Sequence, residues 1–252
     1  MAIWLRSLAF NIGYLGGSAM LAVIMVPTLA MRRGAMRWLG RLWAAQVNGL
    51  LKYVVGARIE FRGLDRVPTG ACLVAAKHQT TWEAIALLGV LPDACYVLKR
   101  ELSLIPVFGW YALKNKQIIV DRTAGAKALK GMLRDARAAV AEGRQIVIFP
   151  EGTRVPAGET RPYQPGIAAL YQALDLPVVP VAVNSGVSWA RHSFIKRPVP
   201  IIAEFGEPLP PGLDRPVFMA RLQAAIEPAT RLLEAEARDG LSPRTPDPSG
   251  GA

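Results

Sequence analysis

Residues 124–149 read AGAKALKGMLRDARAAVAEGRQIVIF, and this stretch decides the fold class. In its first part, apolar side chains recur at three- and four-residue spacing with basic side chains between them, which predicts an amphipathic helix over 124–142. Gly143 suits the end of that helix. The apolar run that follows predicts a buried strand over 145–149. A helix that leads directly into a buried strand is typical of α/β proteins.

The same alternation continues on both sides of this stretch. It predicts strands over 58–61, 71–76, 94–99, 117–121, 145–149, 178–183 and 201–205, and helices over 82–91, 124–142, 165–174 and 215–237. We therefore expect an α/β domain over 56–237 with a mostly parallel central sheet flanked by helices. In such sheets, functional residues gather in the loops after the carboxyl ends of the strands. The proline- and glycine-rich residues 238–252 are predicted to be a disordered tail.

A long uncharged segment precedes this domain. No charged residue occurs from 7 to 31, about 25 residues, and a helix of that length would measure about 37 Å and could cross a bilayer. One arginine precedes the segment, and four follow it closely: Arg32, Arg33, Arg37 and Arg41. This asymmetry favours a cytoplasmic position for the rest of the chain. The segment is too long for the apolar part of a typical signal peptide.

A second helical pattern runs over 34–55, with Arg33, Arg37 and Arg41 as a basic stripe and Trp38 and Trp43 suited to the headgroup zone. Two interpretations are open: an interfacial amphipathic helix, or an ordinary helix packed on the domain. Two geometries are open as well. The first helix crosses the bilayer, or both helices enter one leaflet as a hairpin. In either case we expect residues 1–55 to anchor the chain to a membrane.

The composition narrows the class of partner. The chain is 52% hydrophobic, its mean hydropathy is +0.24 and its net charge is +11, which points to a nucleic acid, a membrane surface or a phosphorylated substrate. No nucleic-acid motif occurs and aromatic residues are not interleaved with basic ones, so nucleic acid is disfavoured. Cys72 and Cys95 lie in apolar runs and are expected to be buried, reduced thiols. Metal-ligand spacing is absent from the sequence, so no metal site is expected.

His78 and Glu83 are the leading candidates for catalytic residues. Positions five apart on a regular helix point about 140° away from each other. The two side chains can meet only if His78 lies in the loop after the strand at 71–76 and Glu83 lies in the first turn of the next helix. A carboxylate on one imidazole nitrogen fixes the tautomer and makes the other nitrogen a better base. The other histidine, His192, lies outside any motif and is expected in a loop.

The second motif follows the strand at 145–149 and reads FPEGTR over residues 149–154. Its glycine turn can expose N–H groups to an anion, and Arg154 can hold a phosphate with two parallel hydrogen bonds. Arg122 and Lys99 end two other predicted strands and are further candidate phosphate contacts. For Arg154 and Lys99 the alternative is a solvated surface residue, and for Arg122 the alternative is an ordinary Asp-Arg turn. The apolar run at 178–183 is interpreted as a core strand, with an acyl pocket as the alternative.

The order and spacing of these motifs resemble the 1-acyl-sn-glycerol-3-phosphate acyltransferase family. The resemblance covers residues 56–208. It rests on the histidine-x4-acid element of His78 and Glu83, on IVDR at 119–122, on FPEGTR at 149–154 and on VVPV at 178–181. The segment 98–111 also looks like the family.

The resemblance implies an acyltransferase in which His78 is the general base and Glu83 takes the family's acidic role. The acceptor phosphate would lie against Arg122, Glu151, Gly152, Thr153 and Arg154, with Lys99 as a further candidate. The implied reaction moves an acyl group from acyl-CoA or acyl carrier protein to the free hydroxyl of lysophosphatidic acid and gives phosphatidic acid. It needs no metal, cofactor or covalent acyl-enzyme. The implied location is the cytoplasmic membrane, with the catalytic domain facing the cytoplasm.

Two residues depart from the family's usual pattern: Glu83 stands where aspartate is usual, and Lys77 stands where asparagine or serine is frequent. Both departures bear on the identity of the acceptor. The alternatives are therefore an acyltransferase for another lysolipid or for an acylated amino-acid lipid, and a catalytically silent protein that binds membrane lipid. A hydrolase is disfavoured because the sequence has no G-x-S-x-G nucleophile elbow.

Overall fold

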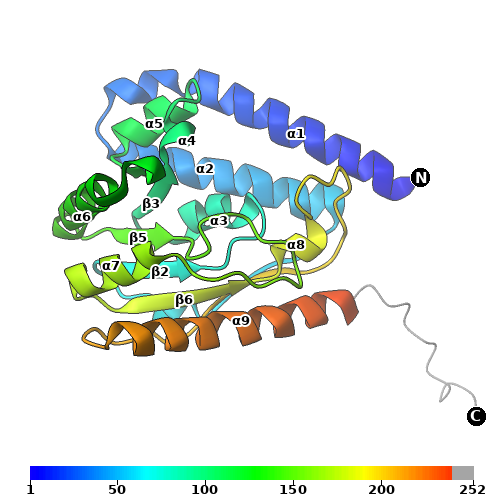
Figure 1. Ribbon diagram of the computed structural model, residues 1–252. Coiled ribbons are helices and arrows are strands. Elements are labelled where there is room, and N and C mark those ends of the chain that lie inside the picture. Colours follow the sequence, from blue (N-terminus) through cyan, green and yellow to red (C-terminus); the bar gives the residue numbers. More distant parts are fainter. Residues whose placement is uncertain (240–252) are drawn as a thin grey trace, which may run out of the picture.

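The computed structural model describes residues 1–239, and its centre is one seven-stranded sheet (Figure 1). The strands are β1 (Ile59–Arg62), β2 (Cys72–Ala76), β3 (Ala94–Lys99), β4 (Ile118–Val120), β5 (Gln145–Ile148), β6 (Val178–Val183) and β7 (Ile201–Phe205). Their order in the sheet is β1-β7-β6-β2-β5-β3-β4. The five strands from β6 to β4 run parallel, β7 is antiparallel to β6, and β1 pairs parallel with β7. The sheet is thus mostly parallel, as predicted.

Helices cover both faces of the sheet. They are α1 (Ala2–Ile24), α2 (Gly34–Leu50), α3 (Trp82–Val90), α4 (Arg100–Ser103), α5 (Phe108–Lys114), α6 (Gly125–Ala141), α7 (Pro165–Leu174), α8 (Ser185–Ser188) and α9 (Arg215–Asp239). Alternate residues of β2 enter two different cores because successive side chains of a strand point to opposite faces. Val74 packs with α2 and α3 on one face, and Leu73 packs with α6, α7 and α9 on the other.

The predicted elements of the α/β domain agree with the structure to within one or two residues at each end, and both cysteines are free and buried. In the N-terminal part, α1 spans residues 2–24, whereas the uncharged segment spans 7–31. Three short helices, α4, α5 and α8, were not predicted. Leu129, one of the apolar residues of the predicted amphipathic helix over 124–142, is 41% exposed in α6. Helix α9 continues to Asp239, so the first two residues of the predicted disordered tail are helical. The rest of that predicted tail, 240–252, lies outside the described residues.

Helix α1 lies along the α/β domain (Figure 1). It is followed by the short helix η1 (Val26–Ala30), which has Pro27 in its first turn. Gln46 and Trp43 of α2 donate hydrogen bonds to Gly13 O and Ser18 Oγ, so α1 and α2 form an antiparallel pair. Among the described residues, α1 is the one helix long and apolar enough to cross a membrane.

Contacts with the domain occur near both ends of α1. The backbone N–H of Lys196 donates to Ser7 Oγ at 2.9 Å, close to the start of the helix. The Tyr111 hydroxyl donates to Ala22 O at 2.9 Å, close to its end. The helix therefore follows the surface of the domain over most of its length.

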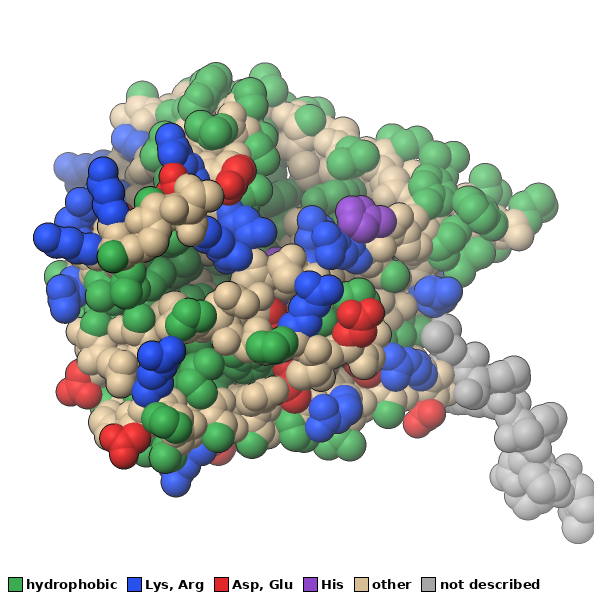
Figure 2. All heavy atoms as spheres, viewed as in Figure 1, with side chains coloured by type: hydrophobic (Ala, Val, Ile, Leu, Met, Phe, Trp, Pro, Cys, Tyr) green, Lys and Arg blue, Asp and Glu red, His purple; other side chains and the backbone are tan. Residues whose placement is uncertain are grey.

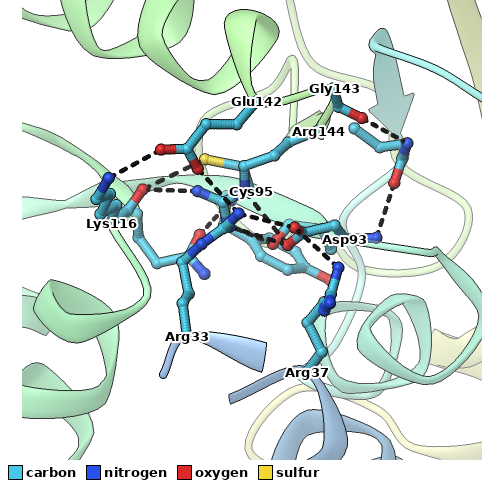
Figure 3. A network of polar contacts seen from close by, with 12 residues as sticks. Arg33, Arg37, Asp93, Cys95, Lys116, Glu142, Gly143 and Arg144 are labelled. Atoms are coloured by element: carbon cyan, nitrogen blue, oxygen red, sulfur yellow. Dashed lines mark hydrogen bonds and ion pairs between the residues drawn. The ribbon is translucent and has the colours of Figure 1, made fainter. Parts of the chain in front are cut away.

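Helix α2 packs on the domain, which agrees with the second interpretation of its pattern. Its apolar face joins the same core as α3. The basic residues at its start enter a network with Asp93, which we call the amino-edge network; its members are Arg33, Arg37, Asp93, Lys116, Glu142 and Arg144 (Figure 3). Asp93 and Arg144 immediately precede β3 and β5, and Lys116 lies two residues before β4, so the network lies at the amino ends of these strands.

Asp93 is the centre of the amino-edge network. It lies 3.1 Å from Arg33 Nη2, 3.3 Å from Arg144 Nε and 3.5 Å from Arg37 Nη1. Glu142 completes the network through Arg33 at 2.9 Å and Lys116 at 2.8 Å. The network joins the N-terminal helices to the α/β domain by charge as well as by apolar packing.

Candidate active site

His78 and Glu83 meet at the carboxyl end of β2. The strand ends at Ala76 and α3 begins at Trp82, so His78 lies in the connecting loop and Glu83 lies in the first helical turn. This is the arrangement that their spacing requires. His78 Nδ1 lies 2.8 Å from Glu83 Oε1.

The Glu83 carboxylate is buried and fully hydrogen-bonded. Its Oε1 accepts bonds of 2.6 Å from the backbone N–H groups of Gln79 and Thr80. Its Oε2 accepts from Thr80 Oγ1 at 2.9 Å and from Ser185 Oγ at 2.8 Å. Burial acts to raise the pKa of Glu83, but the bonds from His78, Thr80 and Ser185 outweigh burial and hold the pKa below its usual value. Glu83 is therefore an ionised acceptor.

An ionised Glu83 determines the state of the histidine. Since the carboxylate can only accept, Nδ1 of His78 must carry the hydrogen that joins them. The Nε2 atom is then an unprotonated base in the neutral ring. The imidazole stacks on Phe149 with ring centroids 4.0 Å apart, and 18% of the His78 side chain is exposed. The ring is thus held by Glu83 and Phe149 and remains partly exposed.

Ser185 is a site residue that the sequence analysis missed. It begins α8, directly after β6, whose carboxyl end lies at the same edge of the sheet as that of β2. The rule that functional residues gather in such loops is the one signal that pointed to it. The strand before it is buried along its whole length, which agrees with its interpretation as core.

A buried ion cluster lies behind His78. The ammonium of Lys77 is 2.6 Å from Glu151 Oε1 and 2.9 Å from Glu227 Oε2, and the Lys77 side chain is fully buried. Glu151 Oε2 accepts a 3.0 Å bond from the backbone N–H of His78. Burial raises the pKa of Glu151, and Lys77 opposes that shift. Both oxygens of Glu151 are thus directed to Lys77 and to the loop that carries His78.

The cations of the FPEGTR segment lie beside the same loop. Arg154 Nη1 donates to Thr81 Oγ1 at 3.2 Å, and Arg122 Nη1 donates to Gly152 O at 2.8 Å. Gly152 has φ +67°, and a Cβ there would lie 2.9 Å from Arg122 Nη1, so the turn requires glycine. Within residues 1–239, neither arginine forms an ion pair with a carboxylate. Both guanidinium groups are therefore available to an anion.

The remaining predicted residues are more peripheral. Thr153 is half-buried and lies in the chain between Gly152 and Arg154. Lys99 is exposed at the end of β3, where its strand partner is Val120, two residues before Arg122. Among the described residues, Lys99 forms no ion pair. His192 is exposed in a loop with φ +60°, as expected. Figure 2 shows this face of the molecule, where the surface is hollowed below α1 and lysine and arginine side chains surround the hollow.

Comparison with known proteins places this geometry in a family. The Acyltransferase family model matches residues 58–184. The chain is 34% identical over 207 residues to the 1-acyl-sn-glycerol-3-phosphate acyltransferase of Pseudomonas aeruginosa, covering 82% of this chain and 80% of that protein. It is 28% identical over 173 residues to the protein of that name from Cocos nucifera, covering 68% of this chain and 56% of the relative.

An animal relative and a solved structure extend the comparison. The chain is 28% identical over 174 residues to the 1-acyl-sn-glycerol-3-phosphate acyltransferase alpha of Mus musculus, covering 68% of this chain and 60% of that protein. The chain thus spans less than two thirds of these plant and animal relatives. The crystal structure of the 1-acyl-sn-glycerophosphate (LPA) acyltransferase from Thermotoga maritima has the same fold, with a TM-score of 0.69 at 16% identity over 96% of this chain and 98% of that one.

Proposed function

Because this chain belongs to the 1-acyl-sn-glycerol-3-phosphate acyltransferase family, we propose that it transfers a fatty acyl group to the free hydroxyl of 1-acyl-glycerol-3-phosphate and forms phosphatidic acid. Acyl-CoA or acyl carrier protein is the donor. The observation that carries the proposal is the contact between His78 and the buried, ionised Glu83, which holds the imidazole through Nδ1 and leaves Nε2 as the ring nitrogen that can take up a proton.

His78 acts as general base in the proposed reaction. The acceptor hydroxyl oxygen attacks the carbonyl carbon of the donor thioester while its proton moves to Nε2 of His78. The C–S bond then breaks, and the thiolate leaves with the proton from the imidazolium. Glu83 stabilises the imidazolium through Nδ1, in the same way as the carboxylate of a serine-protease triad. No metal, cofactor or covalent acyl-enzyme enters these steps.

Arg122 and Arg154 hold the acceptor phosphate in this proposal, and Lys99 adds positive charge at the same sheet edge. Two guanidinium groups without carboxylate partners in residues 1–239 suit a phosphate dianion. Gly152 lets Arg122 approach the turn, and Thr153 continues it. Glu151 has a supporting role, since its oxygens hold Lys77 and the His78 backbone.

The proposed location is the cytoplasmic membrane, with the catalytic domain on the cytoplasmic side. The four arginines that follow the apolar segment support this orientation. Contacts near both ends of α1 with the domain support a position of α1 in one leaflet, because a helix that follows the domain surface cannot at the same time project across the bilayer. In this geometry α1 lies in one leaflet with its outer face in lipid.

The test is an assay of the purified full-length protein with labelled acyl-CoA or acyl carrier protein and a panel of lysolipids, with the products identified by mass. We expect phosphatidic acid from 1-acyl-glycerol-3-phosphate, at a rate that exceeds that with acceptors lacking the phosphate. If product forms only from another lysolipid or from an acylated amino-acid lipid, then that lipid, and not 1-acyl-glycerol-3-phosphate, is the acceptor. Absence of any product, with lipid binding retained, would support the silent lipid-binding alternative.

A further inference from the structure

The unpredicted helices α4 and α5 form a compact hairpin over residues 100–114 with an apolar surface. No side chain from Leu102 to Leu113 is charged. Five large apolar side chains of the hairpin are exposed, by 37% to 72%: Leu102, Leu104, Ile105, Trp110 and Leu113. In the rest of residues 56–239, exposed large apolar side chains are scattered singly, which is normal for a soluble surface. The cluster on the hairpin is the exception.

This apolar surface meets the outer face of α1. On the side of α1 away from the buried Phe10, four exposed side chains recur at three- and four-residue spacing, and a fifth follows about two turns later: Leu5, Leu8, Ile12, Leu15 and Val23. The hydrogen bond from Tyr111 to Ala22 O joins α5 to the end of this stripe. Figure 1 shows α5 beside α1, and Figure 2 shows hydrophobic side chains along the upper edge of the molecule.

The ends of the hairpin are basic. Lys99 and Arg100 precede its apolar part, and Lys114 and Lys116 follow that part, with Glu101 as the one acidic residue between Lys99 and Lys116. Arg100 and Lys116 are paired with Asp121 and Glu142, so the cations offered to lipid phosphates are Lys99 and Lys114, which form no ion pair within residues 1–239. An apolar tip between cationic shoulders matches a membrane surface, because the tip can enter the acyl region while the cations remain at the level of the lipid phosphates. Trp110, 52% exposed, belongs to the residue type that is enriched at this interface.

The tip of the hairpin, the turn over residues 104–107 between α4 and α5, has a fixed shape. A Cβ at Gly109 would lie 2.0 Å from Ser103 O, so α4 and α5 are packed back to back. Val107 has φ +65°, a conformation that β-branched residues rarely adopt, and Phe108 N donates across it to Pro106 O at 2.7 Å. Because the turn is already formed, insertion requires no ordering of the chain.

We propose that the α4–α5 hairpin is a second membrane-inserting element, which enters the same leaflet as α1. The inference rests on the proposed attachment through α1 and adds a surface of the catalytic domain itself. The hairpin starts where β3 ends, at the sheet edge that carries His78, and the ion pair of Arg100 with Asp121 at 2.7 Å fixes it beside Arg122. The candidate site then opens to lipid between the two inserted elements, and an acceptor reaches it without leaving the leaflet.

Nitroxide labels at three positions of the full-length protein test this arrangement. Leu15→Cys reports on α1, Leu104→Cys on the hairpin, and Leu232→Cys on α9; Leu104 and Leu232 are both 72% exposed, which makes them a matched pair. The native Cys72 and Cys95 are fully buried, and burial raises the pKa of their thiols to about 12 and about 11, so they do not compete for the label. The probe is a vesicle of phosphatidylcholine with about 30% phosphatidylglycerol, which makes its surface anionic.

On vesicles we expect the labels at 15 and 104 to collide with oxygen more than with a water-soluble nickel complex, and the label at 232 to show the reverse. A label at 104 that behaves like the one at 232, while 15 is in lipid, would overturn the hairpin proposal and leave the α1 attachment intact. If 15 and 104 are both in water, both proposals fail.

A charge substitution gives a second measurement. Leu104→Glu combined with Leu113→Glu should lower the vesicle partition coefficient by about tenfold or more, because two acidic groups must then enter an anionic interface. Leu232→Glu should leave the coefficient unchanged. Equal partitioning of the double variant and the Leu232 variant would contradict the proposal.

Discussion

Charged clusters lie at both ends of the parallel strands, and they differ in the partners of their arginine side chains. At the amino edge, Arg33, Arg37 and Arg144 all lie within 3.5 Å of Asp93. At the carboxyl edge, Arg122 and Arg154 contact only neutral oxygens among the described residues. An arginine that already holds a carboxylate stabilises the fold, whereas one without a carboxylate partner can bind a substrate anion. The partner of each cation, more than its residue type, therefore separates structural charge from candidate binding charge.

The comparison predicts that function is lost at the carboxyl edge without loss of stability. His78→Ala should reduce turnover by about a thousandfold, because a general base typically contributes 10²–10⁴ to the rate. Acyl transfer by the purified variant measures the effect, and thermal unfolding verifies its fold. His192→Ala is the matched control, since the second histidine is exposed in a loop, and it should retain activity. A folded His78→Ala variant with normal turnover would remove His78 from the reaction.

A substitution at the amino edge should lower stability without loss of function. Asp93→Ala leaves the buried Arg144 and its neighbours without their shared carboxylate, which should cost about 3 kcal/mol of unfolding free energy. For a chain of this size, that corresponds to a fall in Tm of roughly 6–12 °C. The KM values for both substrates should remain unchanged at a temperature where the variant is folded. A change in acceptor KM without a change in Tm would show that the two edges are not separate in function.

Two arginine substitutions test the same difference between the carboxyl and amino edges, with smaller expected effects. Arg154→Ala should raise the KM for a phosphate-bearing acceptor by about 10- to 100-fold, the range expected for a lost charge-assisted pair. It should raise the KM for the acyl donor much less. Arg37→Ala, at the amino edge, should alter neither KM. Equal increases for donor and acceptor in the Arg154 variant would argue against a phosphate contact.

The smallest expected effect concerns Glu83, where the family usually has aspartate. Glu83→Asp withdraws the carboxylate by about one bond length from His78, Thr80 and Ser185, so we expect a fall in kcat of less than about tenfold. Glu83→Gln, which removes the charge and keeps the length, should cost more. If the aspartate variant were as impaired as the glutamine variant, the position of the carboxylate would matter as much as its charge.

The sequence predicted the sheet well because each strand is a local apolar run between helices. It also predicted that His78 and Glu83 could meet, since they are five residues apart and one loop decides the outcome. It could not predict the partner of Lys77, because Glu227 lies 150 residues further along the chain. The hairpin at 100–114 was missed for another reason: its helices are only four and seven residues long, and its turn depends on the unusual backbone of Val107.

The pairing of Lys77 with Glu227 also has a consequence for biosynthesis. The lysine is synthesised 150 residues before the glutamate, and at 5–20 residues per second the interval is about 8–30 s. During that interval Lys77 lacks at least one of its two carboxylates, and a charge that is incompletely neutralised stays in water. The apolar N-terminal helices emerge first and can already associate with a bilayer. The chain would thus reach the membrane before its catalytic loop is held in place, and α9 would be the last element needed to complete the site.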